Sequence, residues 1–154
     1  MANLSQEVLG FGTDLLYGDT ADYATASSYT SVATELVDIE PPTHDADAIK
    51  TKHFKSTSQW ETSVPGWGKS GDVKFKAHFS PAEFNTLVGF HRVPKAYKVV
   101  FANYPYGGGS SSASATGDVI KFNGWLKTIG VPVDLDGLVE VECTIDVSGK
   151  PAIA

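Results

Sequence analysis

The chain has 154 residues and a formal net charge of −6 at pH 7. Its length fits one domain, 1–154, and its 42% hydrophobic content is enough for a core, which excludes an intrinsically disordered chain. Only 19% of the residues are charged, while glycine, serine and threonine are abundant, so we expect a mainly β protein. The acidic balance disfavours tight binding of nucleic acids.

The cysteine content and the first residues bear on the cellular compartment. One cysteine, Cys143, favours folding inside a cell, because small secreted domains usually carry disulfides. The chain does not start with a basic segment followed by an apolar one, and no apolar run approaches about eighteen residues. We therefore expect neither a signal peptide nor a membrane span.

Residues 1–30 show no sustained strand or helix period and are predicted to form an extended arm. Its apolar residues, among them Leu15 and Leu16, need a cover that a neighbouring molecule could supply. Residues 31–40 are rich in strand formers and stop before Pro41, whose nitrogen cannot donate to a strand ladder. A first strand is predicted there.

Residues 43–70 contain many turn residues and no clean period. A segment this long without secondary structure is usually functional or mobile. We therefore predict a long loop that contacts a partner.

The next segments carry clear strand and helix signals. Apolar and polar residues alternate over 73–79, which predicts a half-buried strand. Ser80 and Glu83 can form a capping box, with Pro81 at the first helical position. A short helix is therefore predicted over 80–92, with its apolar stripe at Phe84, Leu87, Val88 and His91.

The C-terminal half predicts three strands. Residues 95–104 and 118–129 are strand-like and flank a Gly- and Ser-rich tip over 107–117, so they predict a long hairpin. The alternation in the second of these strands slips at Gly124, as it would at a bulge. The strand over 139–147 has the cleanest alternation of the chain.

The reactive residue types do not group into a recognisable site. The four histidines lack metal-ligand spacing, and Cys143 lies on an apolar strand face, where we expect a buried, inert thiol. The Asp-rich segments 45–47 and 134–137 lack the remaining calcium ligands and are interpreted as turns, with Gly137 at positive φ. We therefore expect no catalytic residue, no metal and no cofactor.

Glu140, Glu142 and Asp146 alternate with the apolar residues of the last strand and occupy its other face. They are compatible with paired catalytic carboxylates, with a solvated face, or with the lining of a channel. Aromatic residues in or near the expected loops suit sugar binding and a protein interface equally well. These residues are Trp60, Trp67, Tyr104 and Tyr106.

Short turn motifs follow one another in a specific order along nearly the whole chain. They are G-T-x-L-x-x-G-D from Gly12 to Asp19, Asp45-x-Asp47-x-Ile49-x-Thr51, Val64-Pro65-Gly66-Trp67, Ser70-Gly71-Asp72-Val73, the S-P-A-E-F start of the helix, Asp136-Gly137-Leu138-Val139-Glu140-Val141, and Asp146-Val147-Ser148-Gly149-Lys150-Pro151. In this order and spacing they resemble the major tail tube proteins of siphoviruses, phages with long non-contractile tails. The resemblance implies a β-sandwich-like tail-tube fold with one short α-helix.

The resemblance also implies a structural virion protein and not an enzyme. Its copies would assemble in the host cytoplasm into stacked rings, expected to be hexameric, that form a hollow phage tail tube for DNA. Further implied partners are tape-measure, tail-tip and tail-terminator proteins, with passage of DNA but no tight binding and no membrane. The alternative is a soluble carbohydrate- or ligand-binding β-sandwich that uses the loop aromatics.

Two sets of residues are assigned to the tube. Glu140, Glu142 and Asp146 are expected to face the lumen, because an acidic lining repels phosphates. Contacts between subunits or between rings are expected from residues of the arm and of the long loop. These are Leu15, Leu16, Asp45, Asp47, Trp60, Pro65 and Trp67.

Overall fold

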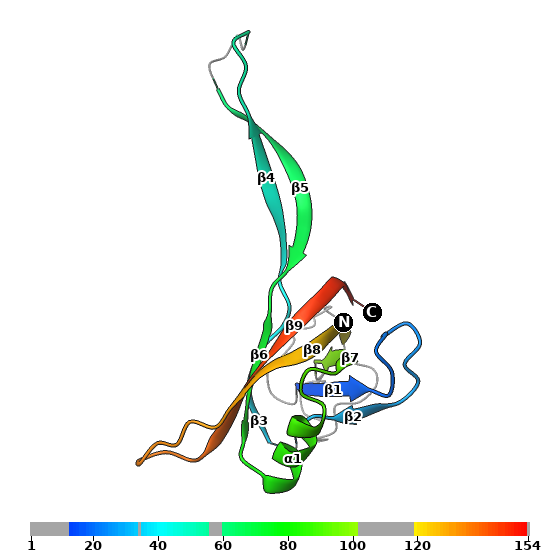
Figure 1. Ribbon diagram of the computed structural model, residues 1–154, viewed down its shortest axis with the longest axis vertical. Coiled ribbons are helices and arrows are strands. Elements are labelled where there is room, and N and C mark those ends of the chain that lie inside the picture. The colour runs from blue at the N-terminus through cyan, green and yellow to red at the C-terminus, as the bar shows by residue number, and fades with distance from the viewer. Residues whose placement is uncertain (1–12, 34, 56–59, 102–118, 154) are drawn as a thin grey trace, which may run out of the picture.

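The computed structural model describes residues 13–33, 35–55, 60–101 and 119–153 (Figure 1). In this part of the chain, antiparallel strands predominate and the helix is short. No helix among these residues is long and apolar enough to span a membrane. In chain order the elements are β1 (Asp14–Gly18), β2 (Tyr29–Ser31), β3 (Leu36–Glu40), β4 (His44–Thr51), β5 (Thr62–Ser70), β6 (Val73–His78), α1 (Pro81–Gly89), β7 (Pro94–Val100), β8 (Val119–Gly130) and β9 (Glu140–Ile153).

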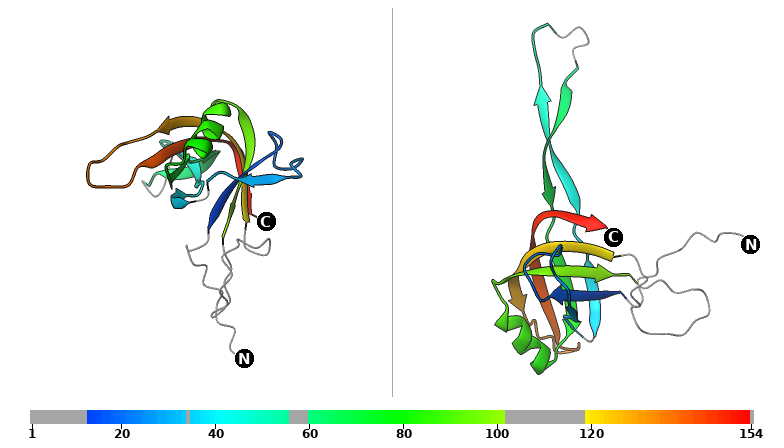
Figure 2. Two further views of the ribbon diagram at one scale, coloured as in Figure 1. Left: turned by 90° about the horizontal axis from the view of Figure 1, so that it is seen from below. Right: turned by 90° about the vertical axis from the view of Figure 1, so that its right-hand side faces the viewer.

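The body of the protein is built on one seven-stranded sheet. Its strand order is β2-β1-β7-β8-β9-β6-β3, and all neighbours are antiparallel. The pairing of β8 with β9 shifts register between Lys121 and Asn123 and again between Leu126 and Thr128. Such irregularities add to the natural twist of strands, and the sheet curls accordingly (Figure 2).

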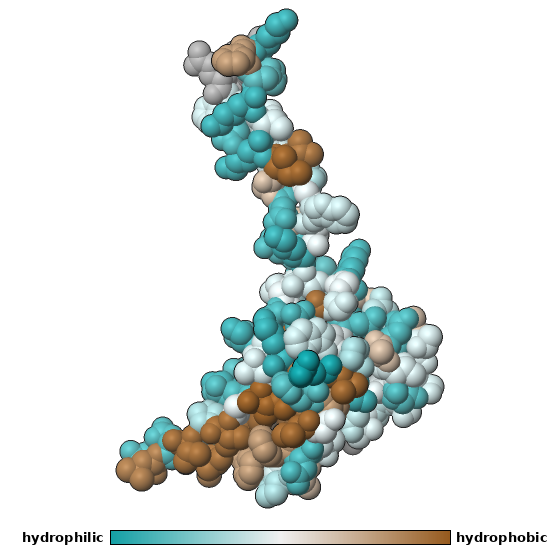
Figure 3. Space-filling view, viewed as in Figure 1, coloured by the Kyte–Doolittle hydropathy of each residue, from teal (hydrophilic) through white to brown (hydrophobic). Residues whose placement is uncertain are grey.

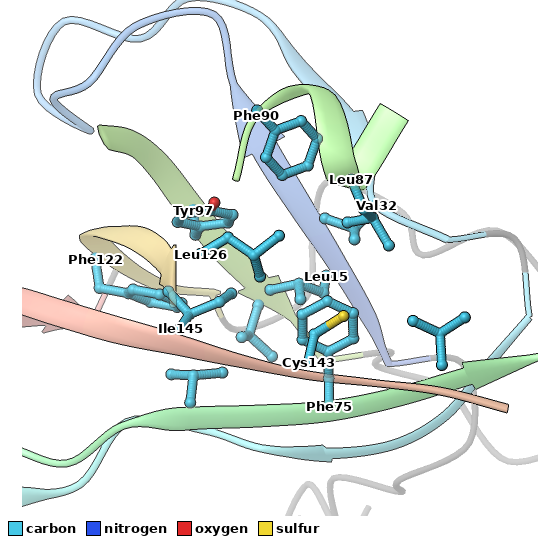
Figure 4. Close-up of a cluster of buried hydrophobic side chains, with 13 residues drawn as sticks. Leu15, Val32, Phe75, Leu87, Phe90, Tyr97, Phe122, Leu126, Cys143 and Ile145 are labelled. Carbon is cyan, nitrogen blue, oxygen red and sulfur yellow. The ribbon is translucent and has the colours of Figure 1, made fainter. Parts of the chain in front are cut away.

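The hydrophobic core lies on the inward side of the curled sheet, with α1 packed against it (Figure 4). Tyr97 and Phe122 are cross-strand partners on β7 and β8, and their rings stack with centroids 5.6 Å apart. Burial of such side chains is the main favourable contribution to folding. The cluster consists of Leu15, Val32, Val73, Phe75, Leu87, Phe90, Tyr97, Val99, Phe122, Leu126, Val141, Cys143 and Ile145.

Several sequence predictions are confirmed. β6 begins at Val73 with alternating buried and exposed residues, and β9 contains nearly all of the predicted strand 139–147 with the same alternation. β7 and β8 pair as predicted, although the tip over 107–117 lies outside the described residues. Cys143 is 3% exposed, which confirms its predicted burial.

The predicted helix is also confirmed, with different ends. It starts at Pro81 but stops at Gly89, earlier than expected. The Ser80 side chain makes no capping hydrogen bond, so the serine half of the predicted capping box is not formed. The chain leaves the helix early because the ring of Phe90 is buried in the core and Arg92 adopts φ 67°, which turns the chain towards β7.

The prediction of an extended arm over 1–30 is wrong for the part that the structure describes; residues 1–12 lie outside it. β1 pairs with β7, and Leu15 is 1% exposed within the core. Leu15 is therefore not available to a neighbour, because its own sheet already covers it. The strand is hard to recognise because its two buried positions are Leu15 and Gly18, which give no alternation of large residues.

The predicted first strand over 31–40 is partly right. β3 ends at Glu40, directly before Pro41 as expected, but it starts only at Leu36. β2, at Tyr29–Ser31, is a separate short strand on the opposite edge of the sheet.

The prediction of a long loop over 43–70 is wrong, because β4 and β5 pair there as an antiparallel hairpin. Every residue of β4 is exposed. Hydrophobic alternation in a sequence reports the burial of one strand face, so a hairpin with both faces exposed leaves no such pattern.

Two predictions about glycines are corrected. β7 and β8 pair without interruption through Gly124, and the buried positions alternate at Phe122, Gly124 and Leu126, so no bulge interrupts that pairing. A Cβ on Gly124 would stand 2.5 Å from the carbonyl oxygen of Asp146, so close packing against β9 explains the glycine. Among the described glycines, Gly149 and not Gly137 adopts positive φ, at +82°.

Candidate assembly surfaces

The β4–β5 hairpin projects away from the body (Figure 1). Asp47 of β4 faces both Gly66 and Trp67 of β5, because the register shifts between Ala46 and Ala48. Such a bulge re-aims side chains. Trp67 is 85% exposed, and the space-filling view shows apolar residues along the hairpin away from the core (Figure 3). The large exposed apolar residues of the hairpin are Ile49, Phe54, Trp60, Val64 and Trp67.

The hairpin is held together by its strand ladder and by exposed polar contacts. The ammonium group of Lys69 donates to the Asp47 carboxylate over 2.8 Å, which raises the pKa of Lys69. The hydroxyls of Thr51 and Thr62 lie 2.7 Å apart near the tip. Exposed pairs of this kind contribute little to stability because water competes for them.

The base of the hairpin is fixed to the end of β9. The Ser70 hydroxyl donates to the carbonyl oxygen of Gly149 over 2.8 Å, and the Gly71 amide donates to that of Thr43 over 3.1 Å. A ring nitrogen of His44 lies 3.4 Å from the carbonyl oxygen of Pro151. The hairpin is therefore anchored at one end only and presents both faces to solvent.

A charged surface covers the outward side of β3, β6 and β9. Cross-strand register places Asp38, Lys76 and Glu142 in one row, and the Lys76 ammonium group lies 3.1 Å from the Glu142 carboxylate. That hydrogen bond raises the pKa of Lys76. Glu40 and Lys74 are partners in the next row.

The predicted acidic residues of β9 are brought together on this surface. Glu140, Glu142 and Asp146 share one strand face, opposite the buried Val141, Cys143 and Ile145. The sequence predicted that face but not the lysines beside it, since Lys74 and Lys76 come from β6, far away in the sequence. Acids still outnumber lysines there, with Asp38, Glu40, Glu140, Glu142 and Asp146 against Lys74 and Lys76.

The residues predicted to contact neighbouring subunits are distributed unevenly. Asp45, Asp47, Trp60, Pro65 and Trp67 all lie on the hairpin or next to it and are exposed. Leu16 is half-buried in β1, between its partners on β2 and β7.

One apolar surface was missed by the sequence reasoning. In the segment between β8 and β9, residues 131–139, the sequence predicts only a turn over 134–137, yet Leu135 is 97% exposed and Val133 and Leu138 are also exposed. The sequence did contain a sign of this surface, because the turn segment carries aliphatic residues where polar residues are usual. The exposed aliphatic residues are Val133, Leu135 and Leu138.

The reactive residues form no site in the described part of the chain. Burial raises the pKa of the Cys143 thiol to about 12, so it stays protonated at neutral pH. Within the described ranges, no three metal-binding side chains converge. The surfaces that remain for function are therefore the hairpin, the charged face and the β8–β9 segment.

The fold can be compared with known proteins. No protein-family model and no curated protein matches the sequence. Among solved structures, the chain is similar to the tail of an empty gene transfer agent particle with sixfold symmetry, with a TM-score of 0.64 and 13% identity over 95% of this chain and 98% of that one.

Two further similarities extend the comparison. The SPP1 tail tube matches with a TM-score of 0.66 and 9% identity over 96% of this chain and 78% of that one. The tube-terminating cap of the anti-feeding prophage matches with a TM-score of 0.70 and 10% identity over 100% and 95%. The chain therefore has the tail-tube fold, which phage-like tubes and the terminators of contractile injection systems share.

Proposed function

We propose that the protein is a structural subunit that assembles with its own copies into the tail tube of a phage or phage-like particle. One observation carries the proposal: the tail-tube fold extends over essentially the whole chain and bears a projecting hairpin whose apolar residues the chain leaves uncovered. A small domain that exposes large apolar side chains on an extended element gains stability by self-association.

The proposed assembly is a stack of hexameric rings. Sixfold symmetry is supported by the gene transfer agent tail, a structural neighbour at full length. The two edges of the curled sheet, β2 and β3, carry backbone groups free to pair with neighbouring subunits in a ring. The hairpin, with Asp45, Asp47, Trp60, Pro65 and Trp67, then contacts further subunits.

In this arrangement the charged face lines the lumen. Glu140, Glu142 and Asp146 give it an acidic excess, although Lys76 neutralises part of it through Glu142. An acidic lining disfavours retention of DNA, because phosphate binding depends on lysine and arginine contacts that release counterions. The protein then works without a catalytic site, cofactor or metal, in a virion assembled with tape-measure, tail-tip and terminator proteins.

The assembly test uses electron microscopy and sedimentation of the concentrated protein, with and without a nucleating tail tip. The matched variant replaces residues 50–63 with Asn-Gly, so that the paired Ile49 and Val64 flank a two-residue turn. Wild-type protein should form rings or tubes. The variant, whose sheet edges are unchanged, should keep the strand circular dichroism of the body and should form no tubes, stopping at single rings or smaller species. A wild type that stays monomeric at every concentration would falsify the proposal and favour a soluble ligand-binding module.

The lumen assignment has its own test. Changing Glu140 and Glu142 to lysine should leave the fold and tube formation intact at a cost of about 1 kcal/mol, because Glu140 is only half-buried but Glu142 loses its ion pair and becomes a lysine opposite Lys76. DNA ejection should slow, and more so at low salt, where screening is weaker. The change Glu142→Gln is the control that removes one charge without adding a lysine. Normal ejection from the double-lysine particles, or a density map with these side chains on the outer wall, would overturn the assignment.

A further inference from the structure

The β8–β9 loop, residues 131–139, forms an apolar and acidic projection at one end of the molecule. Val133, Leu135 and Leu138 are each more than 70% exposed, and Figure 3 shows the projection as a hydrophobic extension of the body. Asp134 and Asp136 lie between them, and neither forms an ion pair with any described residue. Apolar side chains this open on a projecting loop indicate a contact surface.

The tip of the β4–β5 hairpin has matching chemistry of opposite charge. Phe54 and Trp60 are fully or largely exposed there. Residues 50–61 contain three lysines, Lys50, Lys52 and Lys55, against one acid, Glu61, which two of the lysines approach at 3.9 and 3.7 Å. The tip is therefore aromatic and net positive, whereas the β8–β9 loop is aliphatic and net negative.

The two surfaces lie at opposite ends of the molecule, with the body between them (Figure 1). A hairpin strand of eight residues spans about 27 Å, and it extends away from the body, so the tip cannot reach the loop of its own chain. We propose that the hairpin tip of one copy docks on the β8–β9 loop of a second copy. This inference rests on the proposed function and names the partner surface that the hairpin uses.

The proposed contact gives the assembly a direction, because its two halves are different surfaces. A contact between unlike surfaces of a subunit is heterologous, and between copies in successive rings it repeats along the stack as an open, one-directional series. Opposite charges fix the direction and register, while the apolar side chains supply the burial. Each ring would thus offer a row of basic tips on one side and a row of acidic loops on the other, which suits stacking in a single direction.

Charge reversal tests the contact in the full-length protein. The loop variant carries Asp134→Lys and Asp136→Lys, and the tip variant carries Lys50→Glu, Lys52→Glu and Lys55→Glu. Each variant alone should raise the critical concentration for tube formation at least about tenfold at low salt, because like charges then face each other. An equimolar mixture, or one chain with both sets of changes, should restore assembly to within about threefold of wild type.

The control applies the same change in net charge elsewhere, with Glu35→Lys and Asp72→Lys, two exposed acids outside the strands, the charged face and the β8–β9 loop. It should leave tube growth near the wild-type rate. The separate change Leu135→Ser should weaken growth at both low and high salt, since it removes apolar burial and not charge. Tubes that form equally well from wild type and from the loop variant would overturn this inference while leaving the proposed function intact. A wild type that forms no tubes would instead remove the proposed function itself.

Discussion

The body and the hairpin differ in where their stability comes from. The body encloses a cluster of buried aromatic and aliphatic side chains under a curled seven-stranded sheet. The hairpin has the same backbone pairing, but its large apolar residues are exposed, and isolated two-stranded hairpins are marginal in water. Hydrogen-bonded strands alone therefore give only a marginally stable element, which is why we propose that a neighbouring subunit covers the hairpin.

The largest effect on stability is expected when a buried aromatic side chain is removed from the body. Phe122 is fully buried and stacked on Tyr97, so Phe122→Ala should lower the free energy of unfolding by about 3–5 kcal/mol. Urea unfolding of the unassembled subunit, followed by circular dichroism, measures this. A loss below about 1 kcal/mol would mean that the core relaxes around the cavity and that the body is less tightly packed than described.

Replacing a glycine by alanine should also have different effects on the stability of the body and of the hairpin. At Gly124 an added Cβ meets the carbonyl oxygen of Asp146 at 2.5 Å, whereas at Gly68 on the hairpin the carbonyl oxygen of Asp45 is 3.9 Å away, in ordinary van der Waals contact. Gly124→Ala should cost about 1–3 kcal/mol through overpacking. Gly68→Ala should be close to neutral in the same urea experiment. Equal effects at both sites would show that β9 moves aside freely.

A hairpin tryptophan should affect assembly without affecting folding. Trp67 is largely exposed in the subunit, so Trp67→Ala should change the free energy of unfolding by no more than about 0.5 kcal/mol. Sedimentation should nevertheless show a clear loss of rings or tubes, because an exposed aromatic residue acts as an anchor only when a partner covers it. Unchanged assembly would leave Trp67 outside the contact surface.

The smallest expected effect is shared by both regions. Lys76 on the body and Lys69 on the hairpin each have a pKa raised by a hydrogen-bonded carboxylate, that of Glu142 and of Asp47 respectively. A raised lysine pKa in the folded state gives stability that is complete below the unfolded pKa and is lost as pH rises through the folded value. Any advantage over the variants Glu142→Gln and Asp47→Asn should therefore vanish at strongly alkaline pH.

Nuclear magnetic resonance titration of the two ammonium groups measures this directly. Each variant should lower the pKa of its own lysine and leave the other lysine unchanged. A lysine pKa that does not respond would mean that the pair is not populated in solution, as is common for exposed ion pairs.

Elements with one buried face were predictable from the sequence. β6 and β9 carry full alternation because each packs one side on the core, and α1 starts at a serine–proline pair that suits a helix N-terminus. The acidic face of β9 followed from the same alternation. The surface position of Trp60 and Trp67 was predictable because they occur in a segment without a core pattern, and both are exposed; their contact with neighbouring subunits stays a prediction.

The tertiary structure decided the remaining features, because they depend on residues that are distant in sequence. The hairpin β4–β5 has no buried face to mark it, and β1 is recognisable only once β7 lies beside it. The sequence pattern suggests a break in the strand at Gly124, whereas in the structure the main chain of β9 occupies the space that a side chain would need. Lys76 lies beside Glu142 only because of the cross-strand register. The basic hairpin tip and the acidic β8–β9 loop can be matched as contact surfaces of two copies only once the fold shows where each of them projects. Periodicity records what one strand buries, whereas pairing and placement are fixed by which strands meet.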